Sequence, residues 1–244
     1  MSGHYYGYDL GRSAGHERPY LYAANQHNNF NLNLLALRLT CTAGWYRLQA
    51  TPALGTYMAA NYAAEPAELR YLIDAYGGIR IHKDIWLDAG ILPSPFGYEG
   101  ALSHELPTYT RSLSAENSPY YLAGARLSLP LCPRLNGYAF VVNGWQNIAE
   151  TNDAKAVIGQ LQYQASKKLL LNASAYVGNE QTVDSLGPRM RSFLDLYAYW
   201  QPSDGVSLLL LCDLGSQQGR QAADGPGGHC QRHSQLPLGP VLAQ

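Results

Sequence analysis

Apolar and polar residues alternate with a period of two along most of the chain. From Trp45 to Leu54 the even positions are apolar, whereas Arg47, Gln49 and Thr51 occupy odd positions. A period of two places successive side chains on opposite faces of an extended strand, so the pattern predicts β-strands with one apolar and one polar face. The same alternation recurs over residues 71–81, 85–91, 121–129, 157–163, 169–177 and 194–200.

In one predicted strand the apolar positions switch from even to odd numbers. Phe30, Leu32 and Leu34 are apolar at even positions, and the next leucines, from Leu35 to Leu39, stand at odd positions. One extra residue in a strand shifts its register in this way, so we expect a β-bulge near Leu34. Further upstream, the tyrosines of residues 5–8 are candidates for a first strand.

The connections between the predicted strands alternate in length. Residues 42–44, 82–84, 133–136, 166–168 and 202–205 read as short turns, and residues 57–69, 93–119, 144–155 and 178–189 as long loops. Short turns at one end and long loops at the other are typical of an outer-membrane barrel. Strands of about ten residues have the length that crosses a bilayer core. We therefore predict an all-β fold, an antiparallel up-and-down transmembrane β-barrel with about ten or eleven strands.

Isolated charges recur on the polar face of these strands. They are Arg47, Asp74, Arg80, Asp88, Arg126 and Asp195. A wet lumen tolerates such a face, which favours the barrel. A soluble β-sandwich also alternates apolar and polar positions, so a soluble all-β binding or carbohydrate-active domain remains the alternative.

Composition narrows the choice of fold and partner. Charged residues make up 14% of the 244 residues, below the roughly 25% of an average soluble domain. The net charge of −1 gives no electrostatic reason to expect nucleic acid as a partner. The longest candidate for a transmembrane helix, residues 206–214, is far too short and is interrupted by Asp213. Trp86, Trp145 and Trp200 stand near predicted strand ends, which fits either an aromatic girdle or core packing.

Motifs for catalysis or metal binding are weak or absent in the sequence. There is no Gly-x-Ser-x-Gly pattern, and the four cysteines show no Cys-x-x-Cys spacing. His229, Cys230 and His233 resemble part of a zinc site but lack a fourth ligand nearby. We therefore expect no enzyme activity, no cofactor and no metal.

The pattern also suggests how the chain is divided. We expect a partial barrel domain over residues 1–215 and an irregular tail, disordered or aberrant, over residues 216–244. The first residues show no apolar segment of the kind that begins a signal peptide, so we expect that an export signal has been lost. On this interpretation the barrel is incomplete.

Several motifs occur together and in order. They are RPYLYAANQHNNFNLNL (18–34), ANYAAEP (60–66), IWLDAGILPSPFGYEGA (85–101), RSLSAENSPYYLAGARLS (111–128) and NGWQNI (143–148). Through these motifs the chain resembles the OmpL-like β-barrel porin family of Gram-negative outer membranes. The resemblance extends from about Tyr5 to Gly215. The resemblance implies a porin-like barrel in the lipid bilayer of the outer membrane, with small polar solutes as possible cargo. It implies no catalytic residues, and it leaves the substrate and the oligomeric state open.

Charged residues of the long loops are candidates for a constriction. Glu65, Glu99, Glu105, Arg111 and Glu116 lie in or beside these loops. If some of them fold inward they would set ion selectivity, whereas the alternative is that they cap loops and face solvent. The full set of candidate lumen or constriction residues is Arg47, Asp74, Arg80, Asp88, Glu99, Glu105, Arg111, Glu116 and Arg126.

Overall fold

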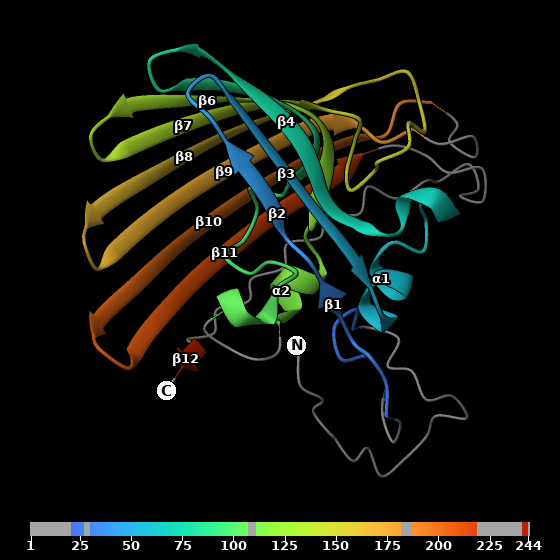
Figure 1. The fold of residues 1–244 in the computed structure, drawn as a ribbon, viewed down its shortest axis with the longest axis horizontal. Coiled ribbons are helices and arrows are strands. Elements are labelled where there is room, and N and C mark those ends of the chain that lie inside the picture. Colours follow the sequence, from blue (N-terminus) through green and yellow to red (C-terminus); the bar gives the residue numbers. More distant parts are fainter. Residues whose placement is uncertain (1–20, 27–29, 107–110, 182–186, 219–240, 244) are drawn as a thin grey trace.

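A single curved antiparallel sheet dominates the structure (Figure 1). The computed structural model describes residues 21–26, 30–106, 111–181, 187–218 and 241–243. The strands are β1 (Leu35–Ala36), β2 (Leu39–Thr42), β3 (Tyr46–Leu54), β4 (Leu72–His82), β5 (Ile85–Pro93), β6 (Tyr121–Cys132), β7 (Leu135–Val142), β8 (Ala156–Ser166), β9 (Leu169–Asn179), β10 (Met190–Ser203), β11 (Val206–Gln218) and β12 (Val241–Ala243). Two short helices, α1 (Thr56–Asn61) and α2 (Leu113–Glu116), and two 3₁₀ turns, Ala67–Leu69 and Ser103–Glu105, lie in the connections.

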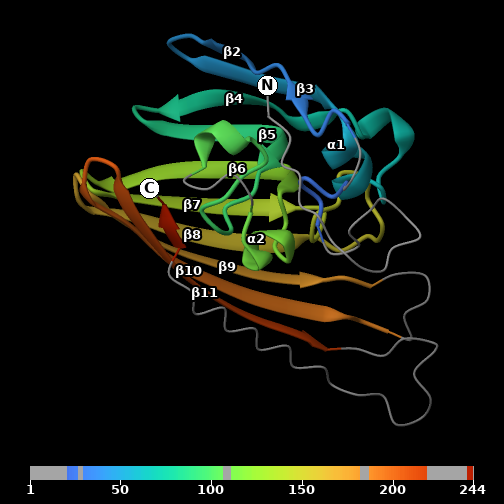
Figure 2. The ribbon, with the colours of Figure 1, turned by 90° about the horizontal axis from the view of Figure 1, so that it is seen from below.

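Each strand from β3 to β11 pairs with its neighbours in sequence, always antiparallel. β1 and β2 both pair with β3 at one edge, and β12 pairs with β11 at the other. Within the described residues these two edges do not pair with each other, so the sheet curves without closing (Figure 2). The predicted antiparallel up-and-down topology is confirmed, with eleven strands on one path and β2 beside β3, and the sheet formed by the described residues is not closed into a barrel.

The two ends of the sheet differ as expected. Short turns join β2 to β3, β4 to β5, β6 to β7, β8 to β9 and β10 to β11. The long connections leave from the opposite end, where α1 lies, and the one that carries α2 runs back along the concave side (Figures 1 and 2). None of the described helices is long and apolar enough to cross a membrane.

The two faces of the sheet have opposite polarity. On β8, Val157 and Leu161 are 57% and 48% exposed, whereas Gln160 between them is 8% exposed. The same holds on other strands, where the exposed apolar side chains include Leu48, Ile79, Leu87, Val141, Val177, Leu194, Leu196 and Leu210. The buried polar residues of the other face include Asp74, Asp88, Asn172, Ser174 and Asp195. A soluble sandwich would bury the apolar set, so this arrangement matches a wall that meets hydrocarbon on its outside.

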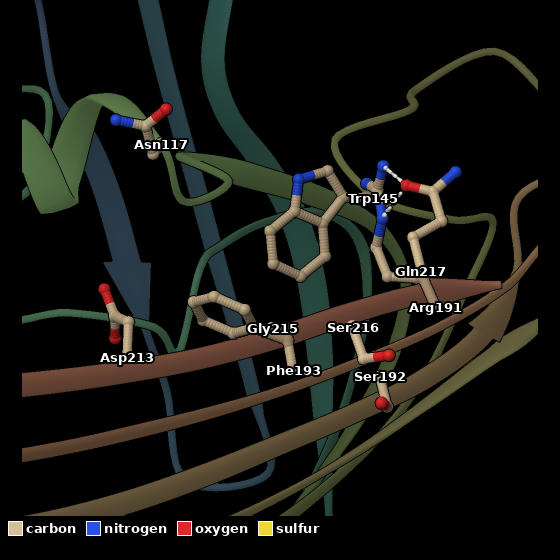
Figure 3. A pocket seen from close by; sticks show the side chains of 9 residues that line it. All are labelled: Asn117, Trp145, Arg191, Ser192, Phe193, Asp213, Gly215, Ser216 and Gln217. Atoms are coloured by element: carbon tan, nitrogen blue, oxygen red, sulfur yellow. Dashed lines mark hydrogen bonds between the residues drawn. The ribbon is translucent and has the colours of Figure 1, made fainter. Parts of the chain in front are cut away.

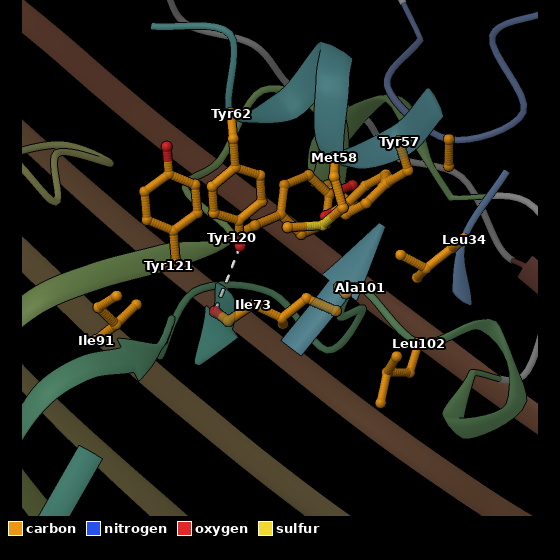
Figure 4. Packing of buried hydrophobic residues seen from close by; sticks show 13 residues of the cluster. Leu34, Tyr57, Met58, Tyr62, Ile73, Ile91, Ala101, Leu102, Tyr120 and Tyr121 are labelled. Atoms are coloured by element: carbon orange, nitrogen blue, oxygen red, sulfur yellow. Dashed lines mark hydrogen bonds between the residues drawn. The ribbon is translucent and has the colours of Figure 1, made fainter. Parts of the chain in front are cut away.

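An apolar cluster near α1 is the exception to this rule. Ile73, Ile91 and Tyr121 belong to the set predicted on the outer face, yet all three are buried. They pack in one cluster with residues of α1 and the chain after it (Figure 4). The rings of Tyr62 and Tyr121 stack with centroids 4.2 Å apart, and the Tyr62 hydroxyl donates to the Ile73 carbonyl. This end of the wall is therefore covered by the chain's own loop.

The phase change near Leu34 has a different cause from the predicted bulge. β1 and β2 pair with β3 in one continuous register, without a shift. The regular strand begins only at Leu35, and Leu34 just before it is buried in the cluster near α1. The odd-position leucines that follow are exposed on the outer face. The change of phase therefore marks the start of the strand.

The proposed division at residue 215 falls inside a strand. β11 continues to Gln218, and β12 pairs with residues 207–209 of β11. Residues 219–240 lie outside the described part of the chain. The irregular tail therefore stays a prediction. The candidate first strand at residues 5–8 also lies outside the described residues.

Candidate functional site: the inner wall and the segment folded against it

The connection from β5 to β6, residues 94–120, lies on the concave side of the sheet (Figure 2). We call it the inward segment; residues 107–110 of it are not described. The carbonyl of Pro95 accepts hydrogen bonds from Gln160 Nε2 at 3.2 Å and Ser174 Oγ at 2.8 Å. The backbone N–H of Gly97 donates to Asp195 Oδ2 at 3.1 Å. The segment thus leaves β5 and is fixed on β8, β9 and β10, across the inner wall.

Aromatic side chains reinforce this attachment. Phe96 is buried, and its ring centroid lies 5.7 Å from Trp145 and 5.4 Å from Phe193. Tyr98 stacks on Tyr199 of β10 at 4.5 Å. Edge-to-face and stacked rings at such distances stabilise a contact beyond the area that they bury.

Part of the inner wall is therefore apolar and covered by the inward segment. Phe96 packs on an apolar patch formed by Leu92, Leu122, Phe140, Val142, Ala156, Ile158 and Tyr176. The alternation predicted a polar inner face throughout, and this is wrong where the inward segment covers the wall. The sequence signal was present, since these residues share the parity of the inward-facing positions of their strands.

Two buried carboxylates face each other beneath the inward segment. Asp195 of β10 and Asp213 of β11 are directly paired in the ladder. Asp195 also accepts from Asn172 Nδ2 at 3.2 Å, and Asp213 accepts from the hydroxyl of Ser114 in α2. With the Gly97 bond, the pair ties both halves of the inward segment to the wall. Asp213 was not among the candidate site residues.

A cavity of about 370 Å³ opens beside Asp213 of this pair (Figure 3). Its walls come from the loop after β7, from β10 and from β11, and they include Trp145, Arg191, Phe193, Asp213 and Gln217. The Arg191 guanidinium lies 4.9 Å from the Trp145 ring centroid and donates to Gln217 Oε1 at 2.6 and 3.1 Å. The cavity combines an aromatic wall with groups of both charges.

A charged row crosses the wall nearer to the short turns. Arg47, Gly78, Asp88 and Arg126 are successive partners in the ladders of β3, β4, β5 and β6. Arg47 donates from Nε and Nη2 to the two oxygens of Asp88, both at 2.6 Å. Arg126 donates from Nε and Nη2 to Asp88 Oδ2 at 3.0 and 2.9 Å. We call these residues the arginine row. Three of the candidate residues are therefore brought together.

Two further candidates lie on the same face but in other settings. Asp74 is buried and accepts from Thr51 Oγ1 at 2.9 Å and Gln49 Nε2 at 3.1 Å. Arg80 is exposed, and its guanidinium lies 5.4 Å from the ring centroid of Trp86. Trp86 faces inward, and the Arg47 guanidinium also lies over its ring, 4.5 Å from the centroid. Trp86 therefore lies on the inner wall and is not part of an outer aromatic girdle.

The charged loop residues mostly fix the loops. Arg111 donates to the carbonyls of Gly100 and Ala101 and to Ser103 Oγ. Glu99 accepts from the backbone N–H and the hydroxyl of Ser112, the residue that caps α2. These contacts shape the inward segment and agree with the loop-capping alternative.

Three glutamates of the long loops join separate parts of the chain. Glu105 forms an ion pair with Arg38. Glu65 accepts from the Tyr121 hydroxyl at 3.0 Å and from the backbone N–H of Ile148 at 2.8 Å. Glu116 accepts from the backbone N–H of Tyr22 at 2.8 Å. Burial raises the pKa of Glu116, although that backbone N–H and the nearby positive charge of Arg111 oppose the shift.

Within the described residues, no group of three or more His, Cys, Asp or Glu side chains is placed to hold a metal ion. His229, Cys230 and His233 lie outside the described part of the chain. The expectations of no metal and no cofactor remain predictions.

The chain matches the family model described as "Putative beta-barrel porin-2, OmpL-like" over residues 3–235. The chain belongs to this family. The resemblance drawn from the motifs is thereby confirmed, and the OmpL-like porin family accounts for a curved wall with an apolar outside. A search of the curated proteins and a search of the solved structures each found no match. As an OmpL-like porin-family member, the protein is an outer-membrane β-barrel porin-like protein in a lipid environment.

Proposed function

We propose that this OmpL-like porin-family protein is a passive diffusion channel for small polar solutes. The single observation that carries the proposal is the division between the two faces of the sheet. Apolar side chains point outward from consecutive strands, whereas charged and amide side chains line the concave side. A wall of this kind separates hydrocarbon from a wettable interior.

The inward segment gives the proposed channel its narrow part. It is held against the wall by backbone and side-chain bonds to β8, β9 and β10 and by the rings around Phe96. It covers the apolar patch but does not touch the arginine row through any hydrogen bond among the described residues. Solutes would therefore pass on the side of the arginine row.

The same segment also supports a second candidate function, a structural barrel that does not conduct. A barrel whose interior is filled by side chains has no continuous path for water. Phe96 and its partners fill part of the concave side in this way. We expect no catalysis in either case, which stays a prediction.

Conductance separates the two candidates. The full chain, refolded in detergent, would be added to planar bilayers and, in parallel, reconstituted into liposomes for swelling assays with sugars of increasing size. We expect discrete conductance steps and a size limit in swelling. Folded protein that inserts into the bilayer but never conducts or admits a sugar would overturn the channel and leave the structural barrel.

A further inference from the structure

The arginine row keeps hydrogen-bond donors that Asp88 does not use. A guanidinium carries five N–H groups in a planar fork. Arg47 and Arg126 each commit Nε and Nη2 to Asp88, and their Nη1 groups have no acceptor among the described residues. The side chain of Asp88 is fully buried, whereas those of Arg47 and Arg126 are 26% and 15% exposed. A solute that reaches Arg47 and Arg126 from the concave side therefore meets N–H donors and positive charge.

A cavity of about 350 Å³ opens beside these two arginines. Arg47 and Arg126 line it together with Trp86, Ser128 and Tyr138. Trp86, Ser128 and Tyr138 form the next row of the ladder toward the short turns. The cavity thus offers two guanidiniums and two hydroxyl groups to one small ligand, beside an aromatic ring.

The balance of charge around the cavity is positive. Arg80 lies over Trp86 and adds a third guanidinium, whereas Asp84 lines the cavity and Asp88 lies beneath it. Three arginines therefore face two carboxylates. A low-dielectric wall with an excess of one sign of charge raises the local concentration of ions of the opposite sign.

The guanidiniums are also held in place before any ligand arrives. Asp88 accepts hydrogen bonds from two N–H groups of each arginine. Each guanidinium also lies over an aromatic ring, Arg47 at 4.5 Å from the centroid of Trp86 and Arg126 at 5.4 Å from that of Tyr76. A planar fork fixed in this way matches the oxygens of a carboxylate or phosphate group. Preorganised donors lose less entropy on binding.

We propose that Arg47 and Arg126, positioned by Asp88, bind small oxyanions in this cavity and make the interior prefer anions over cations. The ligand chemistry is that of carboxylate and phosphate groups. Binding itself is independent of conduction, whereas the ion preference rests on the proposed channel function.

Binding is tested on the full chain folded in detergent. The urea midpoint of unfolding would be measured with inorganic phosphate or acetate replacing chloride at constant ionic strength. A ligand that binds the folded state raises the midpoint. We expect phosphate, acetate or both to give a rise that follows a binding curve, unlike the rise linear in concentration that exclusion of an anion from the protein surface gives. The anion that does so shows whether the site takes a phosphate or a carboxylate group. No binding curve with either anion would overturn the proposal.

Arg126→Lys tests the role of the fork in this binding. The variant keeps the charge beside Asp88 but loses the bidentate donor, so we expect an apparent affinity for the anion about tenfold weaker. Arg134→Lys is the matched control, since Arg134 is an exposed turn arginine whose guanidinium donates to the Ala165 carbonyl at 3.4 Å. Equal affinities of the two variants would contradict the proposal.

Ion preference is tested by reversal potentials in bilayers under a salt gradient. Arg80→Gln should shift the preference toward cations and Asp84→Asn toward anions, and both residues are exposed. Arg134→Gln should leave it unchanged. No conductance, with the anion effect on unfolding intact, would overturn the channel alone. Conductance without any shift in these variants would overturn the anion preference.

Discussion

Gly78 shows how one residue sets the geometry of the arginine row. It stands between Arg47 and Asp88 in the ladder, and the ion pair crosses directly over it. A Cβ at this position would overlap Asp88 Oδ1. Because Asp88 is held by two arginines, its carboxylate cannot move aside without breaking bonds to them.

Gly78→Ala should therefore destabilise the folded protein, by about 1–3 kcal/mol as for other overpacked sites. The free energy of unfolding would be measured by urea titration in detergent. Gly159→Ala is the matched control, because a Cβ at Gly159 of β8 would have no neighbour within 4 Å. Equal stability of the two variants would contradict the prediction, because it would mean that the side chains of the arginine row can make room for an added Cβ.

The raised pKa of Glu116 predicts how the stability of the folded protein changes with pH. Its pKa is raised above the ordinary value of 4.5, so the folded state binds the proton more tightly than the unfolded state. Its contribution to stability is therefore most favourable at low pH and is lost as pH rises from 4.5 through the raised value.

Glu116→Gln keeps an acceptor for the Tyr22 N–H but cannot ionise. The stability of the variant relative to the natural protein should increase over that pH range and then level off. Urea titrations at several pH values would measure this, and Glu68→Gln, at an exposed position, controls for the loss of one carboxylate. A difference that does not change with pH would contradict the prediction.

At the scale of elements, the inward segment depends on one buried ring. Phe96 contacts aromatic side chains of β9, β10 and the loop after β7. The remaining anchors on the wall are the stack of Tyr98 on Tyr199 and the hydrogen bonds of Pro95, Gly97 and Ser114. Deleting a buried phenylalanine side chain costs about 3–5 kcal/mol, which exceeds the roughly 0.5–1.5 kcal/mol of an ordinary hydrogen bond.

Phe96→Ala should thus release the inward segment from the wall. Arg111 in this segment is buried, so trypsin should cut after it slowly in the natural protein and much faster in the variant. The rate of that cleavage, followed by mass spectrometry, is the measurement. Phe30→Ala, at a ring that is 88% exposed, is the control. Unchanged cleavage would mean that the polar anchors suffice.

At the scale of the whole molecule, the outward apolar face should respond to charge as a lipid-facing surface does. Leu161 and Gln162 are neighbours near the middle of β8 and point to opposite sides of the sheet. Leu161→Arg should lower the free energy of unfolding in lipid vesicles by about 2–4 kcal/mol, the cost of arginine at a bilayer midplane. Gln162→Arg, facing the interior, should cost less. The reverse order would contradict the assignment of the faces.

How much of this could be predicted from sequence depends on what the pattern encodes. Alternation around Gln160 and Asp195 predicted the strands and their faces, because a period of two is a property of each strand alone. The grouping of Arg47, Asp88 and Arg126 depends on the register between strands, which a list of charged positions does not contain.

The inward segment was harder to predict for the same reason. Residues 93–119 were predicted to be a long loop, but the partners of this loop, Ser174 and Asp195, lie about 80 to 100 positions away along the chain. The burial of Ile73 and Tyr121 likewise depends on where α1 comes to rest. Only the apolar residues at inward positions, such as Phe140 and Ile158, signalled that part of the interior would be covered.

The course of the inward segment has a mechanical consequence. Both of its ends are attached to neighbouring strands, β5 and β6, while Gly97 and Ser114 between them are fastened to β10 and β11, four and five strands beyond β6 along the wall. It therefore spans the concave side and fixes how far apart those strands can move. An open sheet is otherwise free to flatten, so this crossing tether would hold the radius of curvature of the wall even where the two edges do not meet.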